Sequence, residues 1–176
     1  QQGYVVATDV KISSQGQRTY GGQKKDIPVD VVAIKPDTRE IIIGEVKSWW
    51  GSTGLTPKHI VGHWPENPSK FVNSFKILNN KDGLRSKFEK LVMDQYGDYE
   101  FKFILYAGRA TGEEEIQENL SQISLFGKPV ELVMIRELLQ NFIDTMQDAN
   151  NSVSTYNNEI AIATLQALNE YNMFKN

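Results

Sequence analysis

The sequence predicts one domain of the α/β class, in which helices flank a mixed central β-sheet. Two observations support this class: apolar runs rich in Val and Ile are bounded by turn residues, and they alternate with segments whose apolar residues recur at helical spacing. The composition agrees, because 176 residues with 40% hydrophobic and 23% charged residues are typical of a globular chain with one core. We expect the core at about residues 1–135 and extra C-terminal helices at about residues 136–176.

A β-hairpin is predicted at residues 29–46, from the two apolar runs VDVVAI and IIIGEV. The residues from Pro36 to Arg39 between them have turn chemistry, with Pro well placed at the second position of the turn. A loop of these residues places Ile34 opposite Ile41. The second run is apolar on both faces, as expected of a strand in the interior of a sheet.

The same register brings two acids, Asp30 and Glu45, side by side. Directly opposed residues have Cβ atoms only about 5 Å apart, and like charges there are destabilising unless something lies between them. A divalent cation would remove that penalty. Because side chains alternate along a strand, Lys47 shares the face of Glu45 and Val46 points the other way. We interpret this cluster as a metal site, because such residues are rarely buried without partners; a solvated sheet face is the alternative.

At these residues the chain resembles the PD-(D/E)xK nuclease superfamily, which has the restriction-endonuclease-like fold. DIPVDVVAI and IIIGEVKSW are similar to the strands that carry its Asp and its Glu-x-Lys. The resemblance implies that Asp30, Glu45 and the main-chain carbonyl of Val46 bind Mg²⁺, or Mn²⁺ in its place, and that Lys47 holds the attacking water. It also implies a DNA endonuclease of the restriction or genome-defence kind, which would dimerise to cut both strands.

The chain departs from the superfamily pattern in two places. The proline is Pro28 and does not directly precede Asp30. The chain also opens at Gln1 without the usual helix that carries an acidic residue, and this start indicates that an upstream segment or domain was removed or not included. Asp9, in a first strand predicted at Tyr4 to Ile12, is expected at the surface. The alternative is that it supplies a further metal carboxylate, if its strand lies beside Asp30.

The charges are distributed unevenly along the chain. Residues 1–93 carry 14 Lys/Arg and 9 Asp/Glu, whereas residues 94–176 carry 5 and 13. The motif lies in the basic half, and a local positive surface matters more for phosphate binding than the total charge of −3. Acids that coat C-terminal helices would explain the asymmetry equally well. Candidate phosphate contacts flank the motif: Arg18, Lys24, Lys25, Lys58 and His59.

A stretch rich in Gly, Pro and Trp follows the motif and is predicted to be a long functional loop with a short helix near residues 57–61. Trp49 and Trp50 are expected in the core, with stacking on a base or sugar as the alternative. His59 and His63 have the spacing of zinc ligands on a helix. A zinc site is not favoured, because the chain has no Cys and no third ligand lies near them.

The remaining elements follow from apolar periodicity and from helix start and stop signals. They are helices at residues 71–78 and 84–96, a strand at 101–107, a helix opened by a capping box of Thr111 and Glu114 and ended by Gly127, a strand at 130–135, and helices at 136–149 and 157–173. No signal peptide or run of membrane-spanning length is evident, so we expect a cytoplasmic protein without a membrane partner.

Two alternative functions remain open. The fold could serve as a non-catalytic module that binds nucleic acid or a partner protein, with the acidic pair as a relic or a salt-bridge cluster. The chemistry could instead act on RNA, although nothing in the sequence resembles an aromatic RNA-reading motif. Dependence on a divalent cation separates the first alternative from a nuclease, and substrate preference separates the second.

Overall fold

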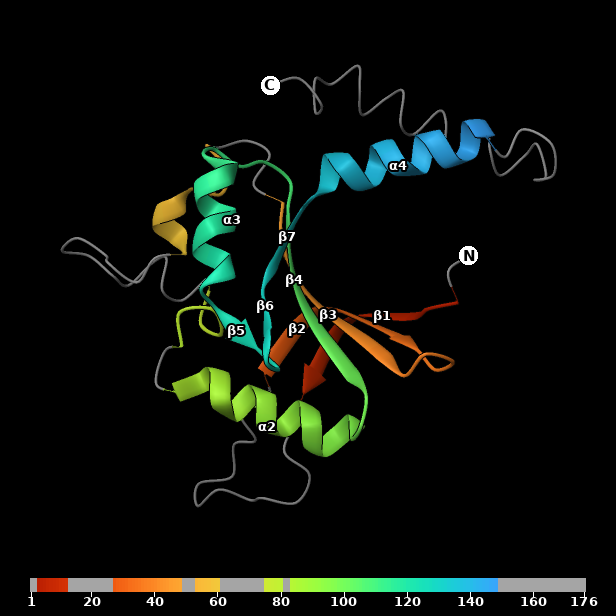
Figure 1. Cartoon of the computed structure of the whole chain (residues 1–176), viewed down its shortest axis with the longest axis vertical. Helices are drawn as coiled ribbons and strands as arrows, with labels where there is room; N and C mark the ends of the chain where they lie inside the picture. The colour runs from red at the N-terminus through yellow and green to blue at the C-terminus, as the bar shows by residue number, and fades with distance from the viewer. Residues whose placement is uncertain (1–2, 13–26, 49–52, 61–74, 81–82, 149–176) are drawn as a thin grey trace.

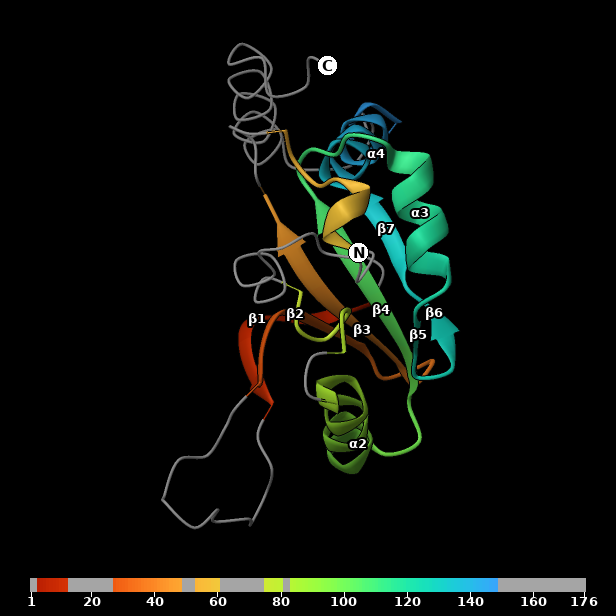
Figure 2. The ribbon, with the colours of Figure 1, turned by 90° about the vertical axis from the view of Figure 1, so that its left-hand side faces the viewer.

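We describe residues 3–12, 27–48, 53–60, 75–80 and 83–148 in a computed structural model of the chain, with side chains up to residue 141. The described part contains a five-stranded mixed sheet in the order β1-β2-β3-β4-β7, and α2 and α3 pack against one of its faces (Figures 1 and 2). The predicted α/β class is therefore confirmed. Trp49, Trp50, His63 and the helix predicted at 157–173 lie outside the described residues.

The first three strands form an antiparallel meander, and the last two strands join β3 in parallel. Parallel neighbours need long crossover connections. One helix of the described part lies within each of them, between residues 84 and 96 and between residues 113 and 121, together with a short 3₁₀ helix in the first. The elements are β1 (Val5–Ile12), β2 (Ile27–Lys35), β3 (Glu40–Lys47), the 3₁₀ helix η1 (Pro57–His59), α2 (Leu84–Tyr96), β4 (Glu100–Ala107), α3 (Glu113–Ser121), the small hairpin β5 (Ser124–Leu125) and β6 (Lys128–Pro129), β7 (Glu131–Met134) and α4 (Ile135–Asp148).

The hydrophobic core lies between the sheet and the helices. Ile41 and Ile43 of β3 are directly beside Phe101 and Phe103 of β4, and Ile41, Ile43 and Phe103 are at most 2% exposed. The core cluster also contains the buried faces of α2 and α3, namely Phe88, Val92, Ile116 and Leu120. The predicted hairpin register is confirmed, since Ile34 pairs with Ile41. The interior position of β3 is confirmed as well.

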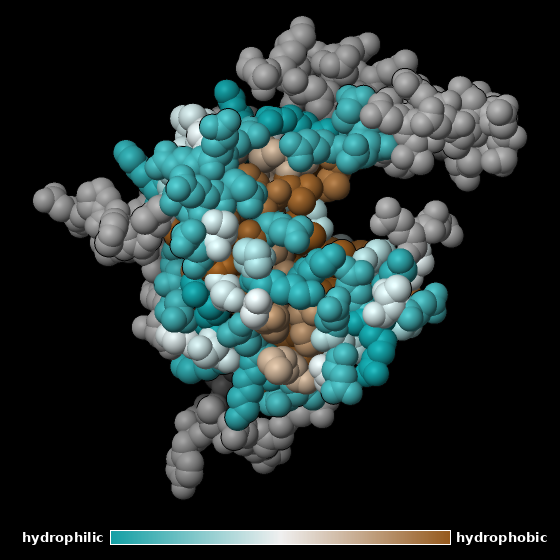
Figure 3. Space-filling model, viewed as in Figure 1, coloured by the Kyte–Doolittle hydropathy of each residue, from teal (hydrophilic) through white to brown (hydrophobic). Residues whose placement is uncertain are grey.

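Gly44 on β3 allows close packing on the other face of the sheet. A Cβ atom at this position would lie 2.7 Å from Cε2 of Tyr106 and 3.3 Å from Cβ of Val31. The missing side chain thus lets the Tyr106 ring lie across β3, one residue before Glu45. In the space-filling view, apolar side chains gather between α2 and α4 (Figure 3).

The capping box predicted for α3 is wrong. The residue before the helix is Gly112, which has a φ of 77°, and the Thr111 hydroxyl donates to the carbonyl of Thr53 at 2.9 Å. The N–H of Thr111 donates to the carbonyl of Leu55 at 2.8 Å. Thr111 therefore joins the segment before η1 to the end of β4, a long-range role that its spacing from Glu114 does not reveal.

Two helix predictions also differ from the structure. α3 ends at Ser121, and Gly127, with a φ of 73°, lies in the turn between β5 and β6. Residues 75–80 form turns in place of the predicted helix, of which residues 71–74 lie outside the described part. η1 is shorter than the helix predicted near residues 57–61, and Thr56 precedes it as the N-cap residue.

Candidate metal centre

Asp30 lies where β2 loses its regular pairing with both neighbouring strands. The ladder between β1 and β2 skips Asp30 and the residue opposite it, Asp9, whose φ of 53° is left-handed. The ladder between β2 and β3 ends at Val31, which pairs with Gly44. Asp and Asn tolerate a left-handed backbone better than most residues, which explains why position 9 carries an Asp. The Asp30 side chain is thus placed at the end of a ladder, facing β3.

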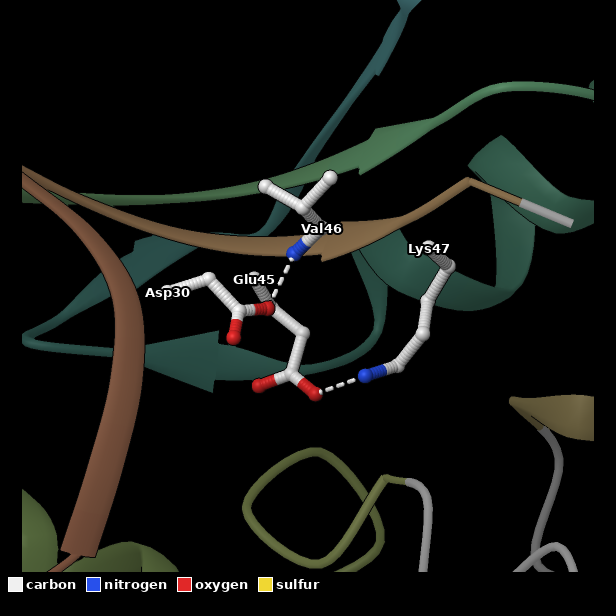
Figure 4. Close-up of polar contacts among 4 residues, drawn as sticks. All are labelled: Asp30, Glu45, Val46 and Lys47. Atoms are coloured by element: carbon white, nitrogen blue, oxygen red, sulfur yellow. Dashed lines mark hydrogen bonds and ion pairs between the residues drawn. The ribbon is translucent and has the colours of Figure 1, made fainter. Parts of the chain in front are cut away.

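The Asp30 carboxylate takes the place of a strand partner for β3. Its Oδ2 accepts a hydrogen bond from the N–H of Val46 at 2.6 Å (Figure 4). The N–H and C=O of one strand residue point to the same edge of the strand. On the other edge, the carbonyl of Lys47 accepts the N–H of Gly108 at 2.9 Å. The carbonyl of Val46 is therefore directed to the side of Asp30, as a metal ligand at this position would require.

Glu45 and Lys47 form an ion pair beside Asp30 (Figure 4). Their side chains are only 19% and 16% exposed. Burial raises the pKa of the Glu45 carboxyl above its usual value, the charge of Lys47 opposes this shift, and the nearby charge of Asp30 adds to it. The structure thus brings together the three predicted residues, with two carboxylates close enough to repel each other in a poorly hydrated place.

These groups fit a small divalent cation. One oxygen of each carboxylate accepts a hydrogen bond, from Val46 to Asp30 and from Lys47 to Glu45. The second oxygens of Asp30 and Glu45 have no hydrogen-bond partner among the described residues and, with the Val46 carbonyl, form a set of hard oxygen donors. Mg²⁺ typically takes one or two carboxylates and keeps several waters.

Asp9 does not extend this set to a third carboxylate. Within residues 3–12, 27–48, 53–60, 75–80 and 83–148, no three His, Cys, Asp or Glu side chains come close enough to hold one metal ion. Asp9 is opposite Asp30 in register, but its side chain is exposed. The two carboxylates on β2 and β3 are therefore the acidic ligands that this part of the chain offers.

Phe75 lies next to the centre, and His59 stacks on its ring. The Phe75 ring centroid is 5.5 Å from Nζ of Lys47 and 6.0 Å from the ring of His59. Sequence analysis missed the position of Phe75, because its apolar spacing with later residues indicated a core helix. No local signal could have found it, since Phe75 and Lys47 are far apart in the sequence.

His59 is a buried residue in the folded chain. It is 7% exposed, and its Nδ1 accepts the N–H of Thr56 at 2.9 Å. Burial lowers the pKa of the imidazole below its usual value, because the charged form loses hydration. The neighbouring Lys58 is exposed and better placed to meet a phosphate. The other candidate phosphate contacts, Arg18, Lys24 and Lys25, lie outside the described residues.

None of the helices in the described residues is long and apolar enough to cross a membrane. Comparisons with protein-family models, with curated proteins and with solved structures found no match to this chain. The fold and the geometry of the Asp30–Glu45–Lys47 centre are therefore the observations from which a function is inferred.

Proposed function

We propose that the chain is a Mg²⁺-dependent nuclease that hydrolyses DNA phosphodiester bonds. The observation that carries this proposal is the pair of partly buried carboxylates, Asp30 and Glu45, next to the Lys47 ammonium at the end of the central strand. Repulsion and burial make this pair unfavourable when both acids are charged, and a bound cation would relieve that cost. The resemblance to the PD-(D/E)xK superfamily adds the expectation of a restriction or genome-defence role.

Asp30, Glu45 and the carbonyl of Val46 would hold the cation. Bound Mg²⁺, or Mn²⁺, would polarise the scissile phosphate and lower the pKa of a water. Glu45 accepts its bond from Lys47 through Oε1, which leaves its second oxygen for a cation. A cation bound there would weaken the hold of Glu45 on the ammonium. Lys47 would then donate to the water or to the phosphate, and offset the negative charge that grows during attack.

Nicking of supercoiled plasmid tests the proposal. The wild-type protein should nick in Mg²⁺ or Mn²⁺ and stop in EDTA, and Asp30→Asn should be inactive because the amide cannot replace a charged ligand. Asp37→Asn is the matched control, since Asp37 is an exposed acid in the turn of the same hairpin. Equal nicking by both variants, or nicking that survives EDTA, would remove the carboxylate pair from the chemistry.

One observation favours a second candidate, a binding module without catalysis. The hydrogen bond from Val46 to Asp30 and the ion pair of Glu45 with Lys47 already give both acids a partner, as a purely structural cluster would have. Such a module should retain its ligand in EDTA and show no turnover. Single-stranded DNA and RNA as parallel substrates would identify an RNA nuclease in the same experiment.

A further inference from the structure

Phe75 is buried in contact with the one cationic side chain of the candidate metal centre. Its side chain is 1% exposed, and its ring centroid lies 5.5 Å from Nζ of Lys47. A cation within about 6 Å of an aromatic ring face is attracted by the negative charge of that face, and the attraction grows when the cation is poorly hydrated. Lys47 meets this condition, because its side chain is 16% exposed.

The ring of Phe75 is itself supported by the sheet through His59. The two rings stack at 6.0 Å with an angle of 29° between their planes. Thr56 holds the imidazole through the bond from its N–H to Nδ1, at 2.9 Å. The N–H of Leu55 donates to the carbonyl of Arg109 at 2.8 Å, which ties this segment to the chain just after β4. The ring therefore rests on a neighbour that is anchored to the sheet.

The two partners of Lys47 differ in what a cation would do to them. The Glu45 carboxylate would be drawn to a metal ion, which would weaken its bond to the ammonium. The Phe75 ring is neutral and cannot bind Mg²⁺ in water, so its attraction for Lys47 persists. We propose that Phe75 is a positioning residue, which holds the Lys47 ammonium in place when Glu45 binds the cation. This inference rests on the proposed function.

A series of fluorinated phenylalanines at position 75 tests the inference. Successive fluorine atoms withdraw electrons from the ring face and weaken its attraction for a cation, while the shape of the ring changes little. The first readout is the rate at which an amine-reactive acylating reagent modifies Lys47, measured by peptide mass spectrometry with and without Mg²⁺. A ring that attracts the ammonium less strongly leaves Lys47 more available to the reagent, so the rate should rise along the series, by about 2- to 30-fold in total.

The second readout is plasmid cleavage by the same proteins. Along the series at position 75, kcat should fall by about 2- to 30-fold while KM for DNA stays unchanged, because the ring acts on Lys47 and not on substrate binding. The matched control is the same series at Phe88, a fully buried ring whose aromatic neighbours are Phe103 and Phe126. Fluorination of Phe88 should change neither readout.

The outcomes separate this inference from the nuclease proposal. Lys47 acylation that is equally fast across the series at position 75 overturns the positioning role, even in a protein that cleaves DNA. Acylation that rises only in that series supports it. If acylation rises there but the wild-type protein cleaves no nucleic acid in Mg²⁺ or Mn²⁺, the nuclease proposal fails while the contact between Phe75 and Lys47 stands.

Discussion

Lys47 is the residue on which the proposed chemistry depends most directly. We expect Lys47→Ala to abolish cleavage while DNA binding survives, because the variant loses the ammonium that would hold the attacking water and offset the developing charge. Plasmid nicking and a DNA-binding titration in Ca²⁺ would measure the two properties separately. Lys58→Ala, which removes an exposed lysine of η1, should instead weaken binding and leave the chemistry intact. Full activity of Lys47→Ala would exclude this lysine from the mechanism.

His59 makes the stability of the fold depend on pH in a definite direction. Its folded pKa lies below the usual value of 6.5, so the unfolded chain binds more protons between the two values. The stabilisation by neutral His59 is complete when the pH is above the usual pKa, and it is lost as the pH falls towards the pKa of the folded state. Between about pH 7.5 and pH 5.5, the free energy of unfolding should therefore fall more for the wild type than for His59→Gln, whose amide oxygen can still accept from Thr56. Urea unfolding at both pH values measures this difference. Equal losses in the two proteins would contradict this.

Glu45 and Asp30 show what sequence can and cannot reveal at a single site. Their proximity follows from hairpin register, which depends on local turn chemistry and strand alternation. The bond from Val46 to Asp30 could not be predicted, because it requires the interruption at Asp9 and the premature end of a ladder. Both are properties of the backbone that do not alter the hydrophobic pattern.

Among the elements, β3 combines a buried strand with a reactive end, and Gly44 lies at the transition. Gly44→Ala should destabilise the fold by about 1–3 kcal/mol, because the new methyl group would overlap the Tyr106 ring. Urea unfolding of the variant, alone and in a Tyr106→Ala background, measures this. The penalty should largely disappear when the ring is removed. A penalty of the same size in both backgrounds would show that Tyr106 is not its cause and would assign the overlap to Val31, whose Cβ would lie 3.3 Å from the new methyl group.

Elements with strong local signals were predicted well, and those defined by distant contacts were not. The hairpin and α2 were found because turn residues and a regular apolar stripe mark them. The hairpin of β5 and β6 was missed, because its strands have two residues each and carry no pattern. The capping-box error at Thr111 has the same origin, since its hydroxyl is used by Thr53, far away in sequence.

For the whole molecule, cation binding and folding should be linked. A ligand that binds only the folded chain stabilises it by about 1.4 kcal/mol at ten times its Kd. The midpoint temperature of thermal unfolding should therefore rise with Mg²⁺ concentration for the wild type, while that of Asp30→Asn should stay constant. Asp37→Asn again serves as the control and should follow the wild type. A shift of equal size in all three proteins would indicate binding of Mg²⁺ elsewhere.

The break in pairing at Asp30 has a consequence for how the centre can be observed. The amide of Val46 bonds to a side chain, whereas a regular strand amide bonds to a backbone carbonyl. Its NMR frequency and its exchange with solvent deuterium therefore depend on the state of one carboxylate. If a cation binds Asp30, the NMR frequency and the exchange rate of this single amide should change, while those of amides within the regular ladders stay constant. If the centre binds a cation as proposed, the Val46 amide would report metal loading without a label at the centre and without a substrate.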